Sequence, residues 1–236
     1  DEAIIHFQIA KKAAIALYDS NHYEVATSML NLLECRLGND EVSVHIEQEF
    51  EAIIKMYEQG ERMNTSHYPY VMQRYADYLV RVSKLSEAEI WIDRCLNVHE
   101  QQDYKYRAKY YVALNSKANI YQHKNDFDES IKTYQLVLRE YSKTTRNATE
   151  DYSSVLRNLA SIYQRQGEYL KSIKTFKECV AILEGLEYNV QRSIADGNAM
   201  IAGSYLMMAD YKKADHHLSI ALSILDKESS NGCREH

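Results

Sequence analysis

Side chains able to do chemistry are present in this chain, but their spacing favours structure over catalysis. The four cysteines, potential nucleophiles or metal ligands, are Cys35, Cys95, Cys179 and Cys233. None of them has the CxxC spacing that is typical of a zinc or redox site. Unpaired, evenly spread thiols are typical of the reducing cytoplasm, where we therefore expect the protein to act.

The histidines and paired acids lead to the same interpretation. His216 and His217 are adjacent, and neighbours on a helix point about 100° apart, so the two rings do not easily share one metal ion. The acidic pair Glu150–Asp151 precedes a predicted helix, where negative charge interacts favourably with the helix dipole. The sequence holds no glycine-rich phosphate loop, GxSxG or HExxH motif. We therefore expect no enzyme activity, no metal and no cofactor.

Composition narrows the class of protein further. The chain has 236 residues, of which 45% are hydrophobic and 26% charged, as in ordinary folded proteins. No apolar run approaches the roughly 18 residues that a membrane span needs, and no signal peptide opens the sequence. The net charge is −6 and the basic residues are scattered, so nucleic acid is not an expected partner. Because the chain begins at Asp1 without a methionine, we expect it to be a piece of a longer protein.

The elements that would position these side chains repeat every 42 residues over the last two thirds of the chain. One column of the repeat holds Ala76, Ala118, Ala160 and Ala202, and five further columns stay in register over four units without a gap. One proline and seven glycines leave few breaks in the helical sequence. A repeat of this length is a supersecondary unit that cannot bury its apolar face alone, so the sequence predicts an all-α stacked array.

Each unit is interpreted as two helices, as the unit over residues 153–186 shows. Its first helix carries Leu156, Ala160 and Tyr163 on one face. Gly167 then interrupts the pattern, and a second apolar stripe follows. Small residues such as Ala160 allow two antiparallel helices to cross closely.

Three short motifs mark this unit, namely Leu159-Ala160-x-x-Tyr163, Gly167-x-Tyr169 and Ser172-x-x-x-Phe176. Together they resemble the tetratricopeptide repeat. That family has a period of about 34 residues and a closing proline, whereas the period here is 42 and the proline is absent. The longer period is similar to that of kinesin light chain repeats. The resemblance implies a right-handed superhelical solenoid of antiparallel helix pairs.

We predict one solenoid over residues 1–227 and a polar tail at 228–236. Its units are expected at 7–36, 69–102, 111–144, 153–186 and 195–227. Between the first two units the spacing from Ala26 to Ala88 is 62 residues instead of 42. The surplus contains an apolar stripe over Val44–Gln59, which predicts one extra helix at about 42–60. It is interpreted either as a decayed repeat or as a break that adds a docking surface.

Three local features complete the predicted organisation. Asn147 with Glu150 three residues later predicts a capping box at a helix start. The stretch Val98–Val112 lacks proline and glycine, so we expect the extra length of the unit to be helical there. The polar end Asp226–His236 is expected to fray.

The resemblance also implies where a ligand would bind. In tetratricopeptide proteins the first helix of each unit lines a concave face. Alignment with that pattern implies a peptide-binding set made of Gln73, Arg74, Asp77, Arg81, Asn115, Asn119, Gln122, Arg157, Asn158, Ser161 and Arg165. Asp196 and Asn198 are the candidates in the last unit. These residues alternate with the core columns, so we expect each of them to face solvent.

The chemistry of this lining indicates the ligand. An asparagine side chain both donates and accepts, so it can hold the backbone of an extended peptide. Arginine offers forked donors suited to carboxylates. We therefore expect an adaptor or scaffold that binds a short acidic segment of a partner protein. Two alternatives remain open: a peptide-sensing domain of a larger bacterial regulator, and a structural subunit that packs into an assembly through surplus tyrosines such as Tyr104.

Overall fold

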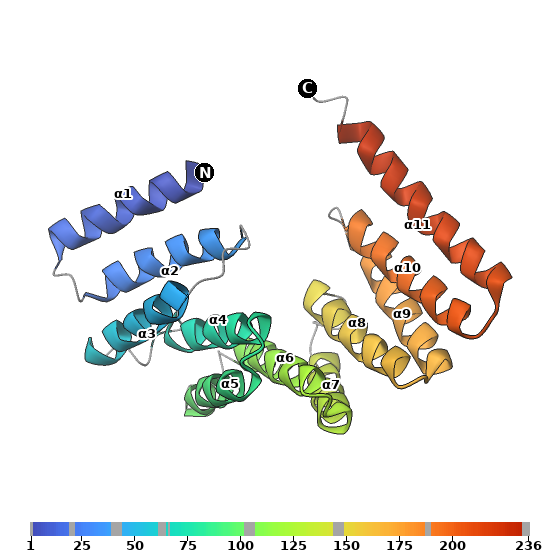
Figure 1. Cartoon of the computed structure of the whole chain (residues 1–236), viewed down its shortest axis with the longest axis horizontal. Helices are drawn as coiled ribbons and strands as arrows, with labels where there is room; N and C mark the ends of the chain where they lie inside the picture. The colour runs from blue at the N-terminus through green and yellow to red at the C-terminus, as the bar shows by residue number, and fades with distance from the viewer. Residues whose placement is uncertain are drawn as a thin grey trace. The chain divides into compact units, whose positions relative to one another are not determined.

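The computed structural model describes residues 2–18, 22–38, 44–60, 65, 67–101, 107–143, 149–186 and 190–232. Within these ranges every regular element is a helix, which confirms the all-α prediction (Figure 1). The helices are α1 (Glu2–Leu17), α2 (Tyr23–Gly38), α3 (Val44–Gln59), α4 (His67–Arg81), α5 (Leu85–Gln101), α6 (Arg107–His123), α7 (Phe127–Ser142), α8 (Glu150–Arg165), α9 (Tyr169–Glu184), α10 (Gln191–Met207) and α11 (Tyr211–Gly232).

The chain forms two compact units. Unit 1 is Asp1–Lys124 and contains α1 to α6, and unit 2 is Asn125–His236 and contains α7 to α11. In both units, successive helices pack on one another as helix pairs. The prediction of one solenoid over residues 1–227 concerns the arrangement of the two units and stays a prediction.

The repeat columns form the core of both units. The alanine column Ala76, Ala118, Ala160 and Ala202 is at most 2% exposed. A second small column, made of Cys95, Val137, Cys179 and Ala221, is at most 4% exposed. Small side chains at these positions let the two helices of a unit cross closely, as the spacing of the columns predicts.

The turn inside each of the last four repeats contains one left-handed residue. These residues are Ser83, Asn125, Gly167 and Ala209, with φ of 62°, 61°, 77° and 57°, and they stand 42 positions apart. After α8, the N–H of Glu168 donates to the carbonyl of Tyr163 at 2.8 Å, and the same bond joins Lys84 to Leu79 and Asp210 to Tyr205. This Schellman arrangement satisfies carbonyls that the helix end leaves open. Glycine occupies only one of the four positions.

The extra helix is present with the predicted bounds, as α3. Its apolar stripe, made of Ile46, Phe50, Ile53, Ile54 and Tyr57, is at most 2% exposed. The helix packs between α2 and α4. Phe50 stacks on Tyr75 of α4, with ring centroids 5.0 Å apart. The apolar face of α3 is therefore used inside unit 1.

Three local expectations need correction or restriction. Thr149 caps α8, since its side chain accepts from the N–H of Tyr152 at 3.3 Å, whereas Asn147 lies outside the described residues. The helix α11 continues to Gly232, where fraying from Asp226 was expected. No glycine or proline interrupts the sequence of α11 before Gly232. Of the stretch Val98–Val112, the part at 102–106 lies outside the described residues.

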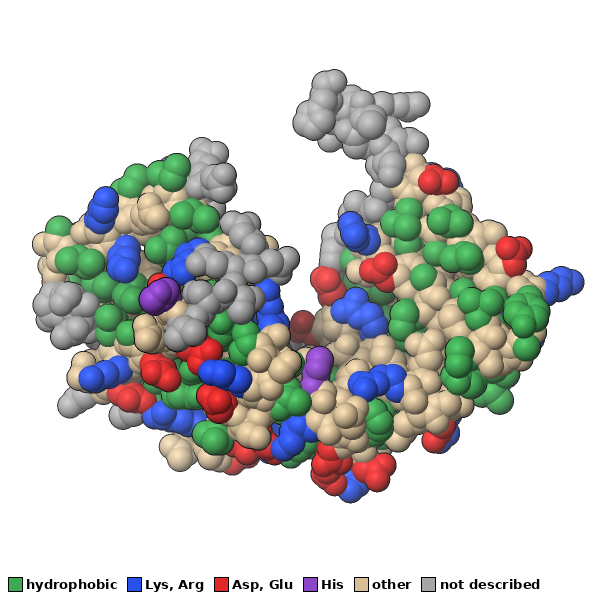
Figure 2. Space-filling model, in the orientation of Figure 1, with side chains coloured by type: hydrophobic (Ala, Val, Ile, Leu, Met, Phe, Trp, Pro, Cys, Tyr) green, Lys and Arg blue, Asp and Glu red, His purple; other side chains and the backbone are tan. Residues whose placement is uncertain are grey.

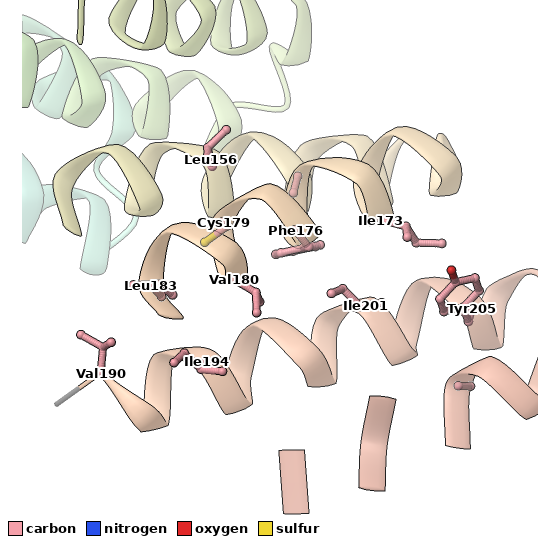
Figure 3. Packing of buried hydrophobic residues seen from close by; sticks show 12 residues of the cluster. Leu156, Ile173, Phe176, Cys179, Val180, Leu183, Val190, Ile194, Ile201 and Tyr205 are labelled. Carbon is pink, nitrogen blue, oxygen red and sulfur yellow. The ribbon is translucent and has the colours of Figure 1, made fainter. Parts of the chain in front are cut away.

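Stacking of one repeat on the next is clearest in unit 2. Phe176, Val180 and Leu183 of α9 point toward α10, where they meet Ile194 and Ile201 (Figure 3). Gly197 of α10 permits the close approach, because a Cβ atom there would lie 2.6 Å from Cγ2 of Val180.

Candidate functional site

The candidate binding residues lie on the first helix of each repeat. Unit 1 contributes α4 and α6, and unit 2 contributes α8 and α10. We call the solvent side of α4 and α6 the first-helix face of unit 1, and that of α8 and α10 the first-helix face of unit 2. The structure brings the predicted residues of α4 and α6 together in unit 1, because these two helices pack side by side.

A pocket of about 400 Å³ opens between α4, α5 and α6. Its lining is Tyr70, Gln73, Arg74, His99, Lys109 and Val112. Gln73 and Arg74 belong to the predicted set, and the other lining residues do not. Tyr70 and Lys109 lie one or two turns before predicted residues on the same helices, so extending the lining toward the helix starts would have found them. His99 comes from a second helix, and no pattern in the sequence points to it.

Arg74 is already paired with carboxylates. Its Nε donates to Oε1 of Glu34 at 2.7 Å, and its Nη1 lies 3.5 Å from Oδ2 of Asp77. The hydroxyl of Tyr70 donates to the same Glu34 oxygen at 3.0 Å. Burial raises the pKa of Asp77, while Arg74 opposes that rise. The network links α2 to α4 and weakens Arg74 as a binder of an external carboxylate.

Gln73 does not face solvent, so that expectation is wrong. It is 9% exposed, and its Nε2 donates to Oγ of Ser116 at 3.1 Å. The position faces α6, which covers it. Arg81 is exposed, but its Nη1 donates to the carbonyl of Leu37 at 3.2 Å and joins α4 to the end of α2.

The α6 residues of the predicted set are half-buried. These are Asn115, Asn119 and Gln122. Oδ1 of Asn115 is buried and meets no hydrogen-bond donor within the described part of the chain. All three side chains are therefore partly accessible on the first-helix face of unit 1.

The α8 residues divide into two kinds. Ser161 turns its hydroxyl onto the carbonyl of Arg157 at 2.9 Å, which is a bond within its own helix. Arg165 donates to Oδ1 of Asn125 at 2.9 Å and lies over the ring of Phe127, 4.8 Å from its centroid. Both side chains therefore have structural roles in unit 2.

Arg157 and Asn158 remain the accessible pair on α8. Both are half-buried, and Arg157 forms no ion pair or side-chain hydrogen bond with the residues that the structure describes. Arg157 lies close enough to Cys179 to oppose the effect of burial, which raises the pKa of that thiol to about 11. Burial also raises the pKa of Tyr134, and the neighbouring Asn158 opposes that rise.

The end of unit 2 departs from the prediction. Asn198 is 4% exposed, although it was expected to face solvent. Its Nδ2 donates to the carbonyl of Ile194 at 3.0 Å, and its Oδ1 lies 2.9 Å from Nδ1 of His217 on α11. Sequence reasoning also missed Gln164, whose Nε2 donates to Oγ of Ser204 at 3.0 Å and so ties α8 to α10. Asp196 is exposed, as expected.

Cys95 and Cys179 have structural roles. The thiols of Cys95 and Cys179 are buried and donate to the carbonyls of Pro69 and Ser153, at 3.1 and 3.2 Å. The two contacts are equivalent positions two repeats apart. Burial raises the pKa of Cys95 to about 12, so its thiol stays protonated at neutral pH.

The described residues contain no metal-ligand cluster and no helix long and apolar enough to cross a membrane. No group of three or more His, Cys, Asp or Glu side chains in the described ranges is arranged to hold an ion. His216 is exposed, while His217 is bound to Asn198. None of the helices in these ranges has a long apolar window.

Residues 109–185 match the tetratricopeptide repeat family. No curated protein matches the sequence. The match and the solved structures below confirm the resemblance on which the site residues were chosen.

Several solved structures share the fold over most of the chain. BtubC (BKLC) from P. vanneervenii has a TM-score of 0.76 at 15% identity, covering 98% of this chain and 92% of that one. The TPR-like repeats assigned to a kinesin light chain of Podosopora anserina have a TM-score of 0.70 at 16% identity, covering 88% and 98%. Aspartyl phosphate phosphatase F from Bacillus subtilis has a TM-score of 0.74 at 12% identity, covering 88% of this chain and 53% of that one. At these identities the similarity is one of fold.

Proposed function

We propose that this chain, whose residues 109–185 are tetratricopeptide repeats, is a non-enzymatic adaptor or scaffold that captures an extended acidic segment of a partner protein. Repeat arrays of this kind act as protein–protein interaction modules. Each unit offers its own proposed binding surface, the first-helix face of α4 and α6 in unit 1 and that of α8 in unit 2. The buried free thiols Cys95 and Cys179 suit the reducing cytoplasm as the place of action.

The pocket between α4, α5 and α6 is the observation that carries this proposal. It has about 400 Å³ of space, largely apolar walls and a few polar groups, which is the usual composition of a ligand site. Lys109 supplies its accessible charge, since it is exposed and forms no ion pair within the described ranges. Arg74 is shared with Glu34 and Asp77, so Lys109 is the stronger attractor of a carboxylate from the partner.

In unit 2, Arg157 and Asn158 of α8 offer the groups that an acidic segment would bind. The guanidinium of Arg157 has no internal partner among the described residues, so its donors are available to a carboxylate. The neighbouring amide of Asn158 can donate to and accept from a peptide backbone. An acidic side chain could bind Arg157 while the main chain beside it forms hydrogen bonds with Asn158.

A peptide array followed by fluorescence anisotropy tests the proposal. We expect acidic peptides to bind, and we expect both Lys109→Glu and the double variant Arg157→Ala/Asn158→Ala to weaken the best peptide by about 10-fold, or about 1.4 kcal/mol. Lys174→Ala, which removes an exposed charge from α9, is the matched control and should leave the affinity unchanged. Equal affinity for all of these variants would exclude the first-helix face.

A peptide-sensing domain of a larger bacterial regulator is the second candidate. The likeness to aspartyl phosphate phosphatase F from Bacillus subtilis favours it at the level of fold, with 88% of this chain covered. The two functions make different predictions for the full-length gene. A DNA-binding or phosphatase module flanking the repeats would support the sensor, and its absence would support the adaptor.

A further inference from the structure

Arg74 lies at a position where the repeat register predicts ligand binding. It stands two repeats before Asn158, at the same register position of a first helix. It also lines the pocket between α4, α5 and α6, together with Tyr70 and Lys109. These three side chains carry a guanidinium, a hydroxyl and an ammonium group, each of which can donate a hydrogen bond to a carboxylate. The donors of this pocket therefore suit an acidic side chain.

A carboxylate of the protein itself already holds two of these donors. Oε1 of Glu34, on α2, accepts from Nε of Arg74 at 2.7 Å and from the hydroxyl of Tyr70 at 3.0 Å. Because Arg74 and Tyr70 both line the pocket, a carboxylate that enters it meets donors that Glu34 occupies. Glu34 thus makes, within the chain, the contacts that an acidic side chain of a partner would make.

The contact between Glu34 and Arg74 is open to exchange. The side chain of Glu34 is 31% exposed and that of Arg74 is 34% exposed. Water therefore screens their attraction, and an ion pair of this kind contributes little to stability. The end of α2 is also held by a second contact, in which Nη1 of Arg81 donates to the carbonyl of Leu37 at 3.2 Å. An incoming carboxylate can thus replace Glu34 without freeing α2.

The position of this ion pair distinguishes it from an ordinary surface pair. Figure 2 shows acidic and basic side chains next to one another on the surface of unit 1. The pair Arg36–Glu49, with a distance of 2.7 Å, joins α2 to α3, and neither of its residues lines the pocket. In the pair Arg74–Glu34, by contrast, the cation belongs to the proposed ligand site. Breaking this pair would therefore change what the pocket offers to a ligand.

We propose that Glu34 is an internal competitor of the partner's acidic segment, and that a carboxylate of the segment replaces it on Arg74 and Tyr70. The inference rests on the proposed binding of acidic segments and adds to it a residue that sets the affinity. Arg74 keeps a carboxylate partner in both the free and the bound state. Glu34 therefore lowers the affinity for an acidic segment, whereas a neutral segment, which does not compete for Arg74, is little affected.

Fluorescence anisotropy with the Glu34→Gln variant of the whole chain tests the inference. The probes are the best acidic peptide from the array and a counterpart whose Asp and Glu residues are replaced by Asn and Gln. Removing the competitor should tighten binding of the acidic peptide about 5-fold, or about 1 kcal/mol, and should not tighten binding of the neutral one. Glu49→Gln is the matched control, because it removes the same charge from the carboxylate that Arg36 binds. It should bind the acidic peptide like the parent.

Combination with Arg74→Ala identifies the group for which the two carboxylates compete. When Arg74 is absent, Glu34→Gln should give no gain in affinity, and circular dichroism of each variant checks that it is folded.

The outcomes separate this inference from the proposed function. An equal gain for Glu34→Gln and Glu49→Gln, or a gain that persists without Arg74, would overturn the inference. So would the absence of any gain although Lys109→Glu weakens the acidic peptide, and in that case the proposed function stands. If the acidic and neutral peptides bind equally and Lys109→Glu has no effect, both the proposed function and the inference fail.

Discussion

The residues that set the repeat geometry are those at the left-handed turns. Gly167 is recognisable in the sequence as a break, because glycine adopts positive φ without a steric penalty. Ser83, Asn125 and Ala209 take the same conformation, with φ of 57° to 62°. Their residue types do not demand it. Only the spacing of 42 residues from Gly167 could have identified them, so the register is more informative at these positions than residue type.

Glycine at position 209 is expected to stabilise unit 2. Alanine in the left-handed region costs about 1 to 2 kcal/mol, and glycine avoids this cost but loses some conformational entropy on folding. Ala209→Gly should therefore raise the free energy of unfolding by about 0.5 to 1 kcal/mol, and Gly167→Ala should lower it by a similar amount.

Thermal or denaturant unfolding followed by circular dichroism measures this change. Ala181→Gly is the control, because Ala181 is an exposed residue within α9. There the same substitution should destabilise by about 0.5 to 1 kcal/mol. A loss of stability in Ala209→Gly as large as that in Ala181→Gly would contradict the assigned turn conformation.

At the scale of the helices, the same repeat column has different burial along the chain. Ile92, Tyr134 and Phe176 are fully buried, while Leu218 is 46% exposed. The sequence predicts that all four belong to one column, and it correctly predicts the helices that carry them. It does not show how far each of these side chains is buried, because burial depends on the neighbouring helices and not on the helix itself.

Replacing side chains of this column by alanine should therefore change the free energy of unfolding by unequal amounts. Phe176→Ala should destabilise unit 2 by about 3 to 5 kcal/mol, because it leaves a cavity between α8, α9 and α10. Leu218→Ala should change stability by about 0.5 kcal/mol or less, as is usual at exposed positions. Urea unfolding compares the free energies of unfolding of the two variants. Similar losses for both would show that α11 is covered.

The contact between α10 and α11 contains a titrating group. Burial lowers the pKa of His217 below 6.5, and the nearby charges of Lys177 and His216 lower it further. A histidine whose folded pKa is depressed binds fewer protons in the folded state than in the unfolded state. Stability that is fully present above pH 6.5 should therefore fall as the pH drops through the folded pKa.

Substitution of this histidine should flatten that dependence. His217→Gln keeps a side chain able to bond Asn198 but does not titrate, so its melting temperature should vary less between pH 7 and about pH 5 than that of the parent. His216→Gln is the matched control, because His216 is exposed on the same helix. If the two variants and the parent share one pH profile, His217 is not the group responsible.

At the scale of the whole molecule, the repeat predicted the fold better than the site. The helix pairs, the core columns and the extra helix α3 follow from periodicity, because burial of a helical stripe is a property of many residues. Single polar residues on those helices were harder to place. Gln73 and Asn198 form hydrogen bonds to other side chains inside the protein, and Arg74 pairs with Glu34 on α2, which lies before the extra helix α3. Such pairings depend on three-dimensional neighbours that the 42-residue register does not specify.

The candidate binding residues that remain come from two sources, the family pattern and the pocket seen in the structure. Arg157 and Asn158 were expected from the family pattern and stay accessible on α8, whereas Lys109 was identified only by the pocket beside α4. The proposed binding of acidic segments rests on Lys109 in unit 1 and on Arg157 and Asn158 in unit 2.

The central claim is that the first-helix face holds the partner segment, and an NMR titration with the best acidic peptide from the array tests it most directly. The claim predicts that backbone amide shifts change on α4, α6 and α8, with the largest changes near Lys109, Arg157 and Asn158. Shift changes confined to α5, α7 and α9 would contradict it, since those second helices form the opposite side of each repeat.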